Sequence, residues 1–255
     1  KMVVASSMSI YGEGAYHCPD CGVVYPRLRA SEQLQRRQWE MRCDQCGEIA
    51  QPIPTTEDKP LFPTSIYAIT KRDHEEMCLT FGRAYGLPTV ALRFFNVYGS
   101  RQSVSNPYTG VAAIFCSRLL NRKPPLIFED GRQQRDFVHV SDIVQAILLA
   151  LGKDEVQDQV FNVGSGQPQS VLDVAHALIR ETGAGVEPQV VNQFRAGDIR
   201  HCYADISKIR QALGYEPEVR FGEGVRELVA WISQEEAEDR VDHAYRELRD
   251  RGLAE

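Results

Sequence analysis

Four cysteines in two C-x-x-C pairs place the strongest constraint on how this chain can fold. Cys18 and Cys21 form the first pair, Cys43 and Cys46 form the second, and a glycine follows each pair. Two such pairs, separated by about twenty residues, supply four thiolates for a tetrahedral zinc ion, and the glycines let the backbone turn tightly around it. The alternatives are two disulfides or two redox-active pairs. The spacing favours zinc over these alternatives. The zinc would be structural, because four thiolates leave no coordination position open for catalysis.

Composition and charge exclude two classes of function. The 255 residues carry a formal net charge of −6, which argues against a general nucleic-acid-binding surface. No apolar run approaches the roughly 18 residues that a membrane span needs, and no secretory signal opens the chain. Of the seven cysteines, those outside the two pairs are odd in number and lie in apolar segments, which suits a reducing compartment. We therefore expect a cytoplasmic protein that binds neither nucleic acid nor a membrane.

Outside the cysteine pairs, hydrophobic patterning predicts an α/β fold built on a parallel sheet. Residues 2–6 have the composition of a buried strand, residues 65–85 are periodic like a long helix that ends at Gly86, and residues 89–94 form a second strand pattern. A strand, a helix and a strand of these lengths indicate a βαβ crossover. Because the chain begins inside the first strand, we expect that the N-terminal part of the fold precedes Lys1.

The rest of the chain alternates between short strands and amphipathic helices. We expect a short surface helix within residues 31–41, and a later helix that Ser141 or Asp142 can cap. The G-x-G at residues 164–166 lacks the third glycine of a dinucleotide-binding fingerprint, so we interpret it as a turn before a helix capped by Ser170. Further strands are expected at 126–128, 135–140 and 159–163, and further helices at 111–121 and from 221 onward.

Tyr67 and Lys71 are the first candidates for catalysis. They are four residues apart in the predicted helix at 65–85, so both lie on one face, one turn from each other. A phenol is a poor base at neutral pH, but a cation beside it favours the phenolate and makes it usable for acid–base chemistry. The pair by itself is common by chance, and a solvated lysine beside a half-buried tyrosine is the alternative.

Four motifs follow one another along the chain in a recognisable order. They are SSMSIYG at 6–12, Y-x-x-x-K at 67–71, RFFNVYG at 93–99 and RDFVHVSD at 135–142. In this order they resemble the extended short-chain dehydrogenase/reductase family, and within it the NAD-dependent nucleotide-sugar epimerases and dehydratases. The glycine-rich pyrophosphate loop of that family has no match, and the family pattern places it before Lys1. A zinc ribbon after the first motif resembles a subset of epimerases that act on dTDP-linked 6-deoxysugars such as dTDP-L-rhamnose.

The resemblance implies a division of the chain and a set of partners. Its parts would be the remainder of a Rossmann-type NAD-binding domain at 1–15 and 53–100, an inserted zinc ribbon at 16–52, and mainly a smaller α/β substrate domain at 101–255, with some segments returning to the Rossmann domain. The implied partners are NAD, a nucleotide sugar and a second copy of the chain. The homodimer would form through the helices at 65–85 and 111–121.

The resemblance also implies roles at the reacting end of the site. Tyr67 would exchange a proton with the sugar hydroxyl, and Lys71 would support the phenolate and hydrogen-bond the nicotinamide ribose. Ser7 matches the Ser or Thr of the family that holds the same sugar oxygen and stabilises charge on it. A loop serine that satisfies the backbone is the alternative for Ser7. Phe94 would contact the cofactor together with Tyr67 and Lys71.

The diphosphate and the ribose of the substrate have their own implied contacts. Arg135 and Arg195 match pyrophosphate-binding arginines, whose planar guanidinium groups suit a diphosphate, and Asp198 matches a ribose-binding carboxylate. Asn96 matches the substrate-facing asparagine of the family, and Asn106 is a further candidate. Surface ion pairs are the alternative for both arginines.

Met8 and Ser9 argue against two of the reaction classes in this family. The 4,6-dehydratases of the family carry an acidic pair at these positions and the decarboxylases carry a glutamate in this loop, whereas neither Met8 nor Ser9 can act as a carboxylate. The resemblance therefore implies C4 epimerisation of a nucleotide sugar, a dTDP-hexose, through a 4-keto intermediate with tightly bound NAD. The alternatives are a 4-ketoreductase or 4,6-dehydratase of the same family, and a non-catalytic zinc-bearing interaction or sensor protein on the same fold.

Overall fold

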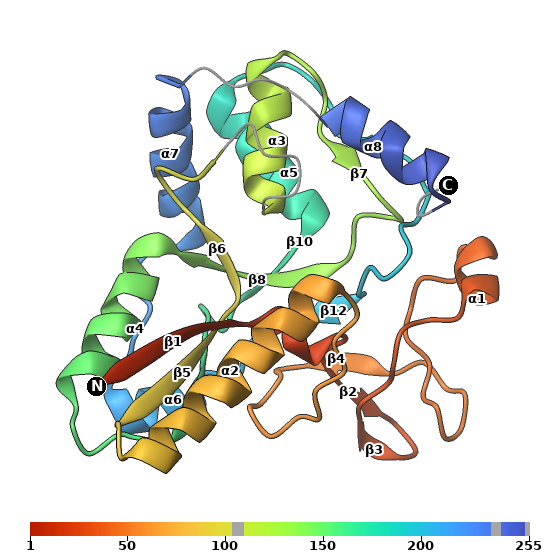
Figure 1. Ribbon diagram of the computed structural model, residues 1–255. Coiled ribbons are helices and arrows are strands. Elements are labelled where there is room, and N and C mark those ends of the chain that lie inside the picture. Colours follow the sequence, from red (N-terminus) through yellow and green to blue (C-terminus); the bar gives the residue numbers. More distant parts are fainter. Residues whose placement is uncertain (104–109, 236–240, 253–255) are drawn as a thin grey trace.

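Three parallel strands in the order β1-β5-β9 form the sheet onto which much of the molecule is packed (Figure 1). They are β1 (Met2–Ser7), β5 (Thr89–Phe94) and β9 (Gln159–Val163). The computed structural model describes residues 1–103, 110–235 and 241–252. Five consecutive residues of β5 are buried, from Thr89 to Arg93, as expected of a central strand that is covered on both faces.

Helices cover both faces of this sheet. α2 (Ile66–Tyr85) packs against β1 and β5 on one face, where a small apolar core lies. α4 (Val140–Gly152) and α6 (Ser207–Leu213) cover the other face with a larger core. β1, α2 and β5 therefore form the βαβ crossover that the hydrophobic pattern predicts.

Local signals in the sequence set both ends of α2. The Oγ of Ser65 accepts the backbone N–H of Ala68 at 3.1 Å, and Gly86 ends the helix in the left-handed conformation with a φ of 65°. The predicted end at Gly86 is confirmed. Because α2 runs antiparallel to the strands that flank it, its first turn lies at their carboxyl ends and Gly86 lies at their amino ends.

A second sheet and three packed helices form another part of the molecule. Its strands are β6 (Asn96–Tyr98), β8 (Gln134–His139), β10 (Pro168–Ser170) and β12 (His201–Cys202). Its helices are α3 (Val111–Leu120), α5 (Val171–Thr182) and α7 (Phe221–Ile232). This part also includes β7 (Leu126–Ile127), β11 (Gln189–Val190) and α8 (Val241–Asp250). β8 pairs with β10 antiparallel and with β6 and β12 in parallel. α3, α5 and α7 bury a core of their own. No helix in the described ranges is both long and apolar enough to cross a membrane.

The cysteine module, residues 16–52, lies between the short 3₁₀ helix η1 and the segment that leads to α2 (Figure 1). Its elements, with the strand that enters it, are β2 (Ala15–Cys18), β3 (Gly22–Val24), α1 (Ser31–Gln35) and β4 (Gln51–Ile53), and η1 spans Met8–Tyr11. The three strands pair antiparallel in the order β3-β2-β4. The module buries only a small core, formed around Tyr16, Met41 and Ala50.

The surface helix predicted within residues 31–41 is shorter in the structure. α1 ends at Gln35, and Arg37 adopts a left-handed φ of 56°. Beyond this point Trp39 and Met41 are both buried. The polar composition favoured a helix, but the burial of these two side chains requires the chain to leave helical geometry.

Neither Ser141 nor Asp142 caps α4, so this prediction is wrong. His139 occupies the cap position, and its Nδ1 accepts the backbone N–H of Ser141. Asp142 is buried and accepts the backbone N–H groups of Glu218 and Val219. The partners of Asp142 lie 76 and 77 residues further along the chain, and no local pattern reveals them.

The G-x-G at 164–166 is a turn, as predicted, and it binds a carboxylate of the protein itself. The backbone N–H groups of Ser165 and Gly166 donate to Asp136 at 2.7 and 2.9 Å. A Cβ at position 164 would lie 2.5 Å from Asp136 Oδ2, which explains the glycine there. The predicted cap at Ser170 is also confirmed, with Asp173 completing a capping box.

Candidate functional site

The carboxyl edge of the parallel sheet brings two of the predicted site residues together. Ser7, the last residue of β1, is the register partner of Phe94, the last residue of β5. Phe94 in turn pairs with Val163, the last residue of β9. Parallel α/β sheets bind their ligands outside the carboxyl ends of the strands, where the following loops diverge. Ser7 and Phe94 therefore lie side by side at the edge where a ligand is expected.

Tyr67 and Lys71 reach the same edge from the first two turns of α2. Lys71 Nζ donates to the backbone oxygen of Ala5 in β1 at 2.9 Å, which holds this face of the helix against the strand. Nζ lies 5.9 Å from the centroid of the Tyr67 ring, and Tyr67 is 57% exposed. The tyrosine ring is therefore open to a ligand, with the lysine ammonium beside it.

Glu75, one turn after Lys71 on the same helix face, anchors α2 to the sheet. Arg93 donates to its carboxylate through Nη2 at 2.6 Å and Nε at 3.0 Å, and the Oγ of Ser6 donates at 2.6 Å. All three side chains are buried. Separating a buried ion pair leaves a charge without compensation in a medium of low polarity. Fixing Glu75 therefore also fixes the direction in which Tyr67 and Lys71 face.

A further layer of hydrogen bonds ties this anchor to the loop after β1. Arg93 Nη1 donates to the hydroxyl of Tyr11 at 2.8 Å, and that hydroxyl donates to Asn162 Oδ1 in β9 at 2.7 Å. Burial raises the pKa of Tyr11 in spite of the nearby arginine, so the phenol stays neutral and can donate. Lys59 Nζ donates to the backbone oxygen of Tyr11 at 3.0 Å, and burial lowers the pKa of Lys59 to about 8.

Ser7 takes part in hydrogen bonds within its own loop. Its Oγ accepts the backbone N–H of Ser9 at 3.2 Å and the Oγ–H of Ser9 at 2.9 Å, and so caps η1. Ser7 accepts in both bonds, so its own hydroxyl proton is left to donate to a ligand. Met8 is buried in the core between the sheet and α4.

Asn96 presents an unsatisfied group near this region. It is the first residue of β6, and its Oδ1 is buried without a hydrogen-bond partner among the described residues. Buried side-chain oxygens in folded proteins are normally paired with protein, water or ligand, so this atom has the capacity to accept a hydrogen bond. Asn106, the other asparagine predicted to face the substrate, lies outside the described residues.

Arg195 and Asp198 form an ion pair with each other. The Nε of Arg195 lies 2.9 Å from Asp198 Oδ2, and the guanidinium stacks over the ring of Phe128 at 4.6 Å. Their side chains are 40% and 34% exposed. The ion pair is the alternative expected for Arg195, but a partly exposed pair contributes little to stability and opens readily.

Arg135 lies beside the same stretch of chain but is committed to backbone contacts. Its guanidinium donates to the backbone oxygens of Ile199 at 2.6 Å and Arg200 at 2.9 Å. We name residues 195–201 the substrate segment, because Arg195 and Asp198 belong to it and Arg135 braces it. Of the residues predicted to bind the diphosphate and ribose, Arg195 and Asp198 lie on this segment, and Arg135 is hydrogen-bonded to it from β8.

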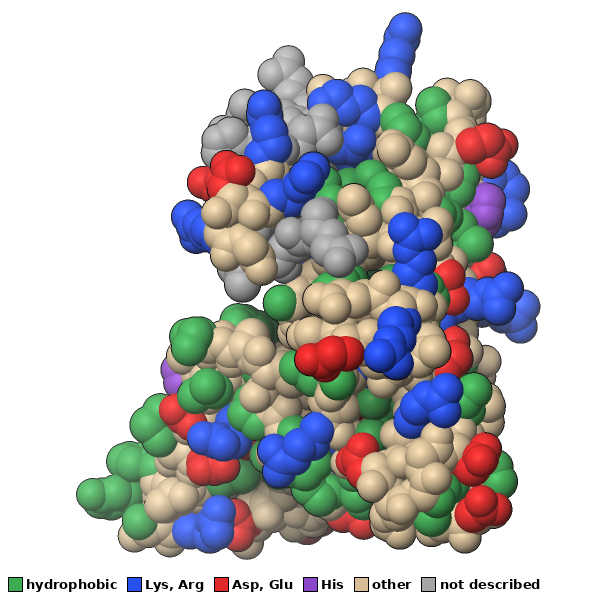
Figure 2. Space-filling model, turned by 90° about the vertical axis from the view of Figure 1, so that its right-hand side faces the viewer, with side chains coloured by type: hydrophobic (Ala, Val, Ile, Leu, Met, Phe, Trp, Pro, Cys, Tyr) green, Lys and Arg blue, Asp and Glu red, His purple; other side chains and the backbone are tan. Residues whose placement is uncertain are grey.

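The surface is hollowed where these parts meet. Figure 2 shows an indentation between the lower part of the molecule, which contains α2 and the cysteine module, and the upper part, which contains α3, α5 and α7. The first turn of α2, which carries Tyr67, is the upper end of that helix (Figure 1). The first turn of α2 therefore lies toward the boundary between the two parts.

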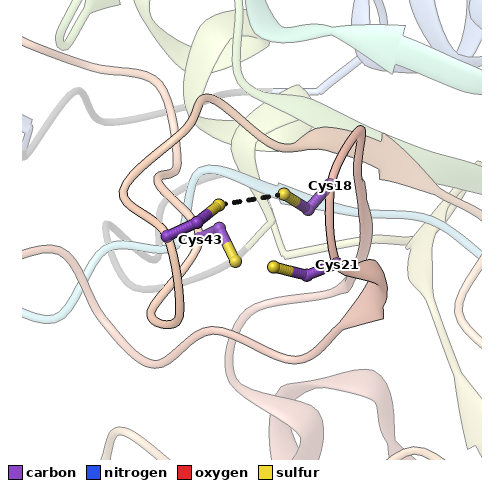
Figure 3. A group of neighbouring side chains, drawn as sticks. Cys18, Cys21 and Cys43 are labelled. Atoms are coloured by element: carbon purple, nitrogen blue, oxygen red, sulfur yellow. Dashed lines mark hydrogen bonds between the residues drawn. The ribbon is translucent and has the colours of Figure 1, made fainter.

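The four paired cysteines converge on one point. Their sulfur atoms all lie within 4.8 Å of one another, with 3.4 Å between Cys18 and Cys46, and Figure 3 shows Cys18, Cys21 and Cys43 pointing toward a common space. All four are free thiols, so the disulfide alternative is wrong. A zinc ion with Zn–S bonds of about 2.3 Å needs sulfurs about 3.8 Å apart, and the cluster fits this requirement. The backbone N–H of Gln45 lowers the pKa of Cys43 to about 7, toward the thiolate that a metal binds.

Comparison with known proteins identifies the family. The sequence profile described as GDP-mannose 4,6 dehydratase matches residues 46–228. The chain is 38% identical over 235 residues to a dTDP-L-rhamnose 4-epimerase of Burkholderia thailandensis, an alignment that covers 92% of this chain and 63% of that protein. The chain belongs to the NAD-dependent nucleotide-sugar epimerase/dehydratase family. The family predicted from the four motifs is thereby confirmed.

Solved structures of epimerases from this family share the fold. UDP-glucose 4-epimerase of Thermotoga maritima with UDP-glucose matches with a TM-score of 0.71 and 32% identity, over 92% of this chain and 64% of that one. UDP-glucuronic acid 4-epimerase of Bacillus cereus, in complex with UDP-glucuronic acid and NAD, gives 0.70 and 26%, over 91% and 61%. The chain spans less than two thirds of the length of each of these three relatives.

Within this candidate site, the sequence did not reveal the residues that hold the others in place. Glu75 had a usable signal, since it follows Tyr67 and Lys71 at the same four-residue interval on one helix face. Arg93 stood at the start of the RFFNVYG motif, although nothing local indicated its partner. Asn162 had no signal, because its contacts with Tyr11 come from a strand 151 residues away.

Proposed function

We propose that this chain carries the catalytic end of an NAD-dependent nucleotide-sugar 4-epimerase whose substrate is a dTDP-hexose. The observation that carries the proposal is the position of Tyr67 and Lys71 beside the sheet edge formed by Ser7 and Phe94. The named relatives support the reaction, since all three are 4-epimerases and the one from Burkholderia thailandensis is named for dTDP-L-rhamnose. Because the chain spans less than two thirds of each, the activity is proposed for the complete protein.

In this proposal the chemistry at C4 of the sugar is proton transfer guided by three side chains. Tyr67 removes the proton of the 4-hydroxyl and later returns it, while the ammonium of Lys71 supports the phenolate and hydrogen-bonds the nicotinamide ribose. Ser7 donates its free proton to the same oxygen and stabilises charge there. Tyr67, Lys71 and Phe94 would hold NAD, which would supply the hydride chemistry at C4. Rotation of the 4-keto sugar between the two transfers inverts the carbon.

The substrate segment would bind the diphosphate and the ribose of the nucleotide sugar. Arg195 would bind the pyrophosphate after leaving its exposed partner Asp198, which would then be free to bind the ribose. Asn96 Oδ1, which lacks a partner among the described residues, would accept a hydrogen bond from the substrate. Arg135, predicted as a second pyrophosphate ligand, already donates to the backbone oxygens of Ile199 and Arg200, so we assign it the task of bracing this segment.

The loop after Ser7 favours epimerase over dehydratase. Elimination of water from the sugar needs an acid and a base beyond Tyr67, and the dehydratases place an acidic pair directly after the serine or threonine. In this chain these positions are Met8 and Ser9, whose side chains carry no carboxyl group. Met8 is buried in the core, and the hydroxyl of Ser9 donates to Ser7.

We also propose the roles of the larger parts of the chain. Residues 1–15 and 53–100 would belong to the Rossmann-type NAD-binding domain, residues 16–52 to an inserted zinc ribbon, and residues 101–255 mainly to the substrate domain. Zinc is the proposed metal, because four cysteine sulfurs in one cluster suit its tetrahedral coordination.

The proposed reaction is tested with the complete protein and labelled substrate. dTDP-L-rhamnose and a panel of other dTDP- and UDP-hexoses, each with deuterium at C4, are incubated with the protein, and the products are analysed by NMR. We expect inversion at C4 with the deuterium retained, because the deuteride taken from C4 would return to the same carbon. Consumption of NADPH with a 4-keto sugar would identify a reductase instead. Failure to bind or convert any nucleotide sugar would contradict the proposal and favour a non-catalytic protein.

We propose that the complete protein is a homodimer that pairs through α2. Apolar side chains of α2 are exposed along the helix, among them Met77, Phe81 and Tyr85 at 59%, 48% and 75%. α3, the other helix predicted to take part, packs its apolar side chains into the second core with α5, so its contribution is not supported. Sedimentation velocity should show a dimer that the exchange Phe81→Glu converts to a monomer. A monomeric unmodified protein would exclude this interface.

A further inference from the structure

The cysteine module is attached to the rest of the protein by a buried ion pair. Arg29 of the module binds Glu129 through two parallel hydrogen bonds of 2.7 and 2.9 Å, and both side chains are 1% exposed. The same guanidinium donates to the backbone oxygen of Trp39 within the module and to the backbone oxygen of Asp198 in the substrate segment, at 2.9 and 3.1 Å. One arginine therefore joins the module to the segment that carries the proposed nucleotide contacts.

A second residue of the module reaches the same segment. Glu40 accepts a hydrogen bond of 2.6 Å from Arg200 Nη2, and its other oxygen lies 3.3 Å from His201 Nε2. Arg200 is fully buried and also binds Glu129 and Asp130. The neighbouring arginine and histidine lower the pKa of Glu40 to about 2, so Glu40 is ionised at neutral pH.

The backbone of the substrate segment is held from the base of the module as well. The backbone N–H of Arg200 donates to Glu13 at 2.6 Å, and that of His201 donates to Glu13 at 3.3 Å. Tyr16, in β2, orients the carboxylate of Glu13 through a hydrogen bond of 2.8 Å. Side chains of the module therefore contact the main chain at Asp198 and the side chains of Arg200 and His201. Glu13, which Tyr16 of the module orients, holds the main chain of Arg200 and His201.

The two attachment residues lie on the stretch of chain that the four cysteines bring together. Glu40 is three residues before Cys43, and Arg29 lies in the loop between Cys21 and Cys43. The module has strands of only three or four residues and a small core, and two of its core residues are Cys18 and Cys43. A unit of this size normally needs a metal or disulfides to stay folded.

We propose that the cysteine module is a metal-dependent positioning device for the substrate segment. The metal on the four cysteines holds Arg29 and Glu40 in place, and these two hold Asp198 and Arg200, so that Arg195 faces the pyrophosphate of the substrate and Asp198 faces its ribose. Glu40 and Arg29 are positioning residues and touch no reacting atom. The inference rests on the proposed function, because the substrate segment is defined by it. It predicts that disturbing the module weakens substrate binding more than it slows the chemical step.

The exchange Glu40→Gln tests this link without disturbing the cysteines. Arg200 keeps Glu129 and Asp130 as partners, so the fold is retained, but the charged contact with the module is lost. We expect KM and Kd for the converted dTDP-hexose to rise about tenfold, with kcat within about twofold of the unmodified protein. The metal content should stay at one ion per chain. Glu32→Gln is the matched control, since Glu32 is exposed on α1 of the same module and should change nothing.

Removal of the metal tests the other half of the link. Zinc is stripped from the complete protein with a chelator, and hydrogen exchange is followed at the amides of Arg200 and His201, which Glu13 protects. We expect these amides to exchange faster and substrate affinity to fall at least as far as in Glu40→Gln. In the stripped protein Glu40→Gln should have no further effect, because both changes act through the same contact. If removal of zinc unfolds the chain, hydrogen exchange at the amides of Arg200 and His201 in Glu40→Gln, together with its substrate affinity, tests whether the module positions the substrate segment.

Three results would overturn the inference. Unchanged substrate affinity in Glu40→Gln and in the stripped protein would mean that the module acts elsewhere. Additive effects of the two changes would mean that the metal and Glu40 act independently. A loss confined to kcat would place the module in the chemical step. In each of these cases the unmodified protein still converts its substrate, so the proposed function stands, whereas an unmodified protein that binds no nucleotide sugar removes the basis of both.

Discussion

Exchanging Tyr67→Phe is expected to lower kcat of the complete protein about a thousandfold while leaving substrate affinity within about twofold. General acid–base groups contribute roughly 10²- to 10⁴-fold to rate, and phenylalanine keeps the ring but removes the only atom that can exchange the proton. Lys71 would remain hydrogen-bonded to Ala5, so the local structure should persist. The measurement is the rate of C4 inversion under saturating substrate, together with the dissociation constant of the same nucleotide sugar.

Tyr85→Phe is the matched control for this experiment. Tyr85 lies at the other end of α2, is 75% exposed and stacks against Phe81 through its ring, which the exchange preserves. Its kcat should equal that of the unmodified protein. If Tyr67→Phe retains full activity, the assignment of Tyr67 as the acid–base group is wrong, whatever the identity of the substrate.

The exchange Glu75→Gln is expected to destabilise the protein by about 3 kcal/mol. Removing one partner of a buried ion pair costs roughly 3–5 kcal/mol, because the remaining charge is left without compensation, and glutamine recovers part of this by keeping the shape. The new amide N–H group would face the donors of Arg93 and Ser6, which now bind a carboxylate. Urea unfolding gives the change directly, and the midpoint of thermal unfolding should fall by about 6–12 °C.

Glu76→Gln supplies the comparison at the next position of the same helix. Its carboxylate is 63% exposed and lies 3.6 Å from Arg72, so its removal should change stability by less than about 0.5 kcal/mol. We expect Glu75→Gln to lower kcat as well, since α2 loses its anchor below Tyr67 and Lys71. Equal stabilities of the two variants would refute the anchoring role of Glu75.

The parts of the fold that the sequence predicts correctly are those set by neighbours along the chain. The end of α2 at Gly86 and the cap at Ser170 depend on contacts within one helical turn, and both follow from local residue types. The spacing of Cys18, Cys21, Cys43 and Cys46 likewise predicts their cluster, because the cysteines of each pair are three residues apart and only one long loop has to close.

The predictions that fail are those in which distant residues compete for a group. Asp142 is a good local cap, but two backbone N–H groups more than seventy residues away bind it instead. The diphosphate role of Arg135 stays a prediction, and here too distant residues share the group, because its guanidinium donates to backbone oxygens of residues 199 and 200. Local residue type gives the chemical capacity of such groups and leaves their partner open.

The sequence by itself determined the family, the βαβ core, the cysteine cluster and the candidates Ser7, Tyr67 and Lys71, because short spacings and ordered motifs carry that information. Only the tertiary structure decided that Glu75 and Arg93 anchor α2 and that Arg29 and Glu40 join the cysteine module to residues 195–201. The bond between Glu40 and Arg200 spans 160 residues. The packing of whole elements decides which carboxylate pairs with which buried arginine. Water screens exposed charges, so any nearby carboxylate could serve as the partner until burial removes that water.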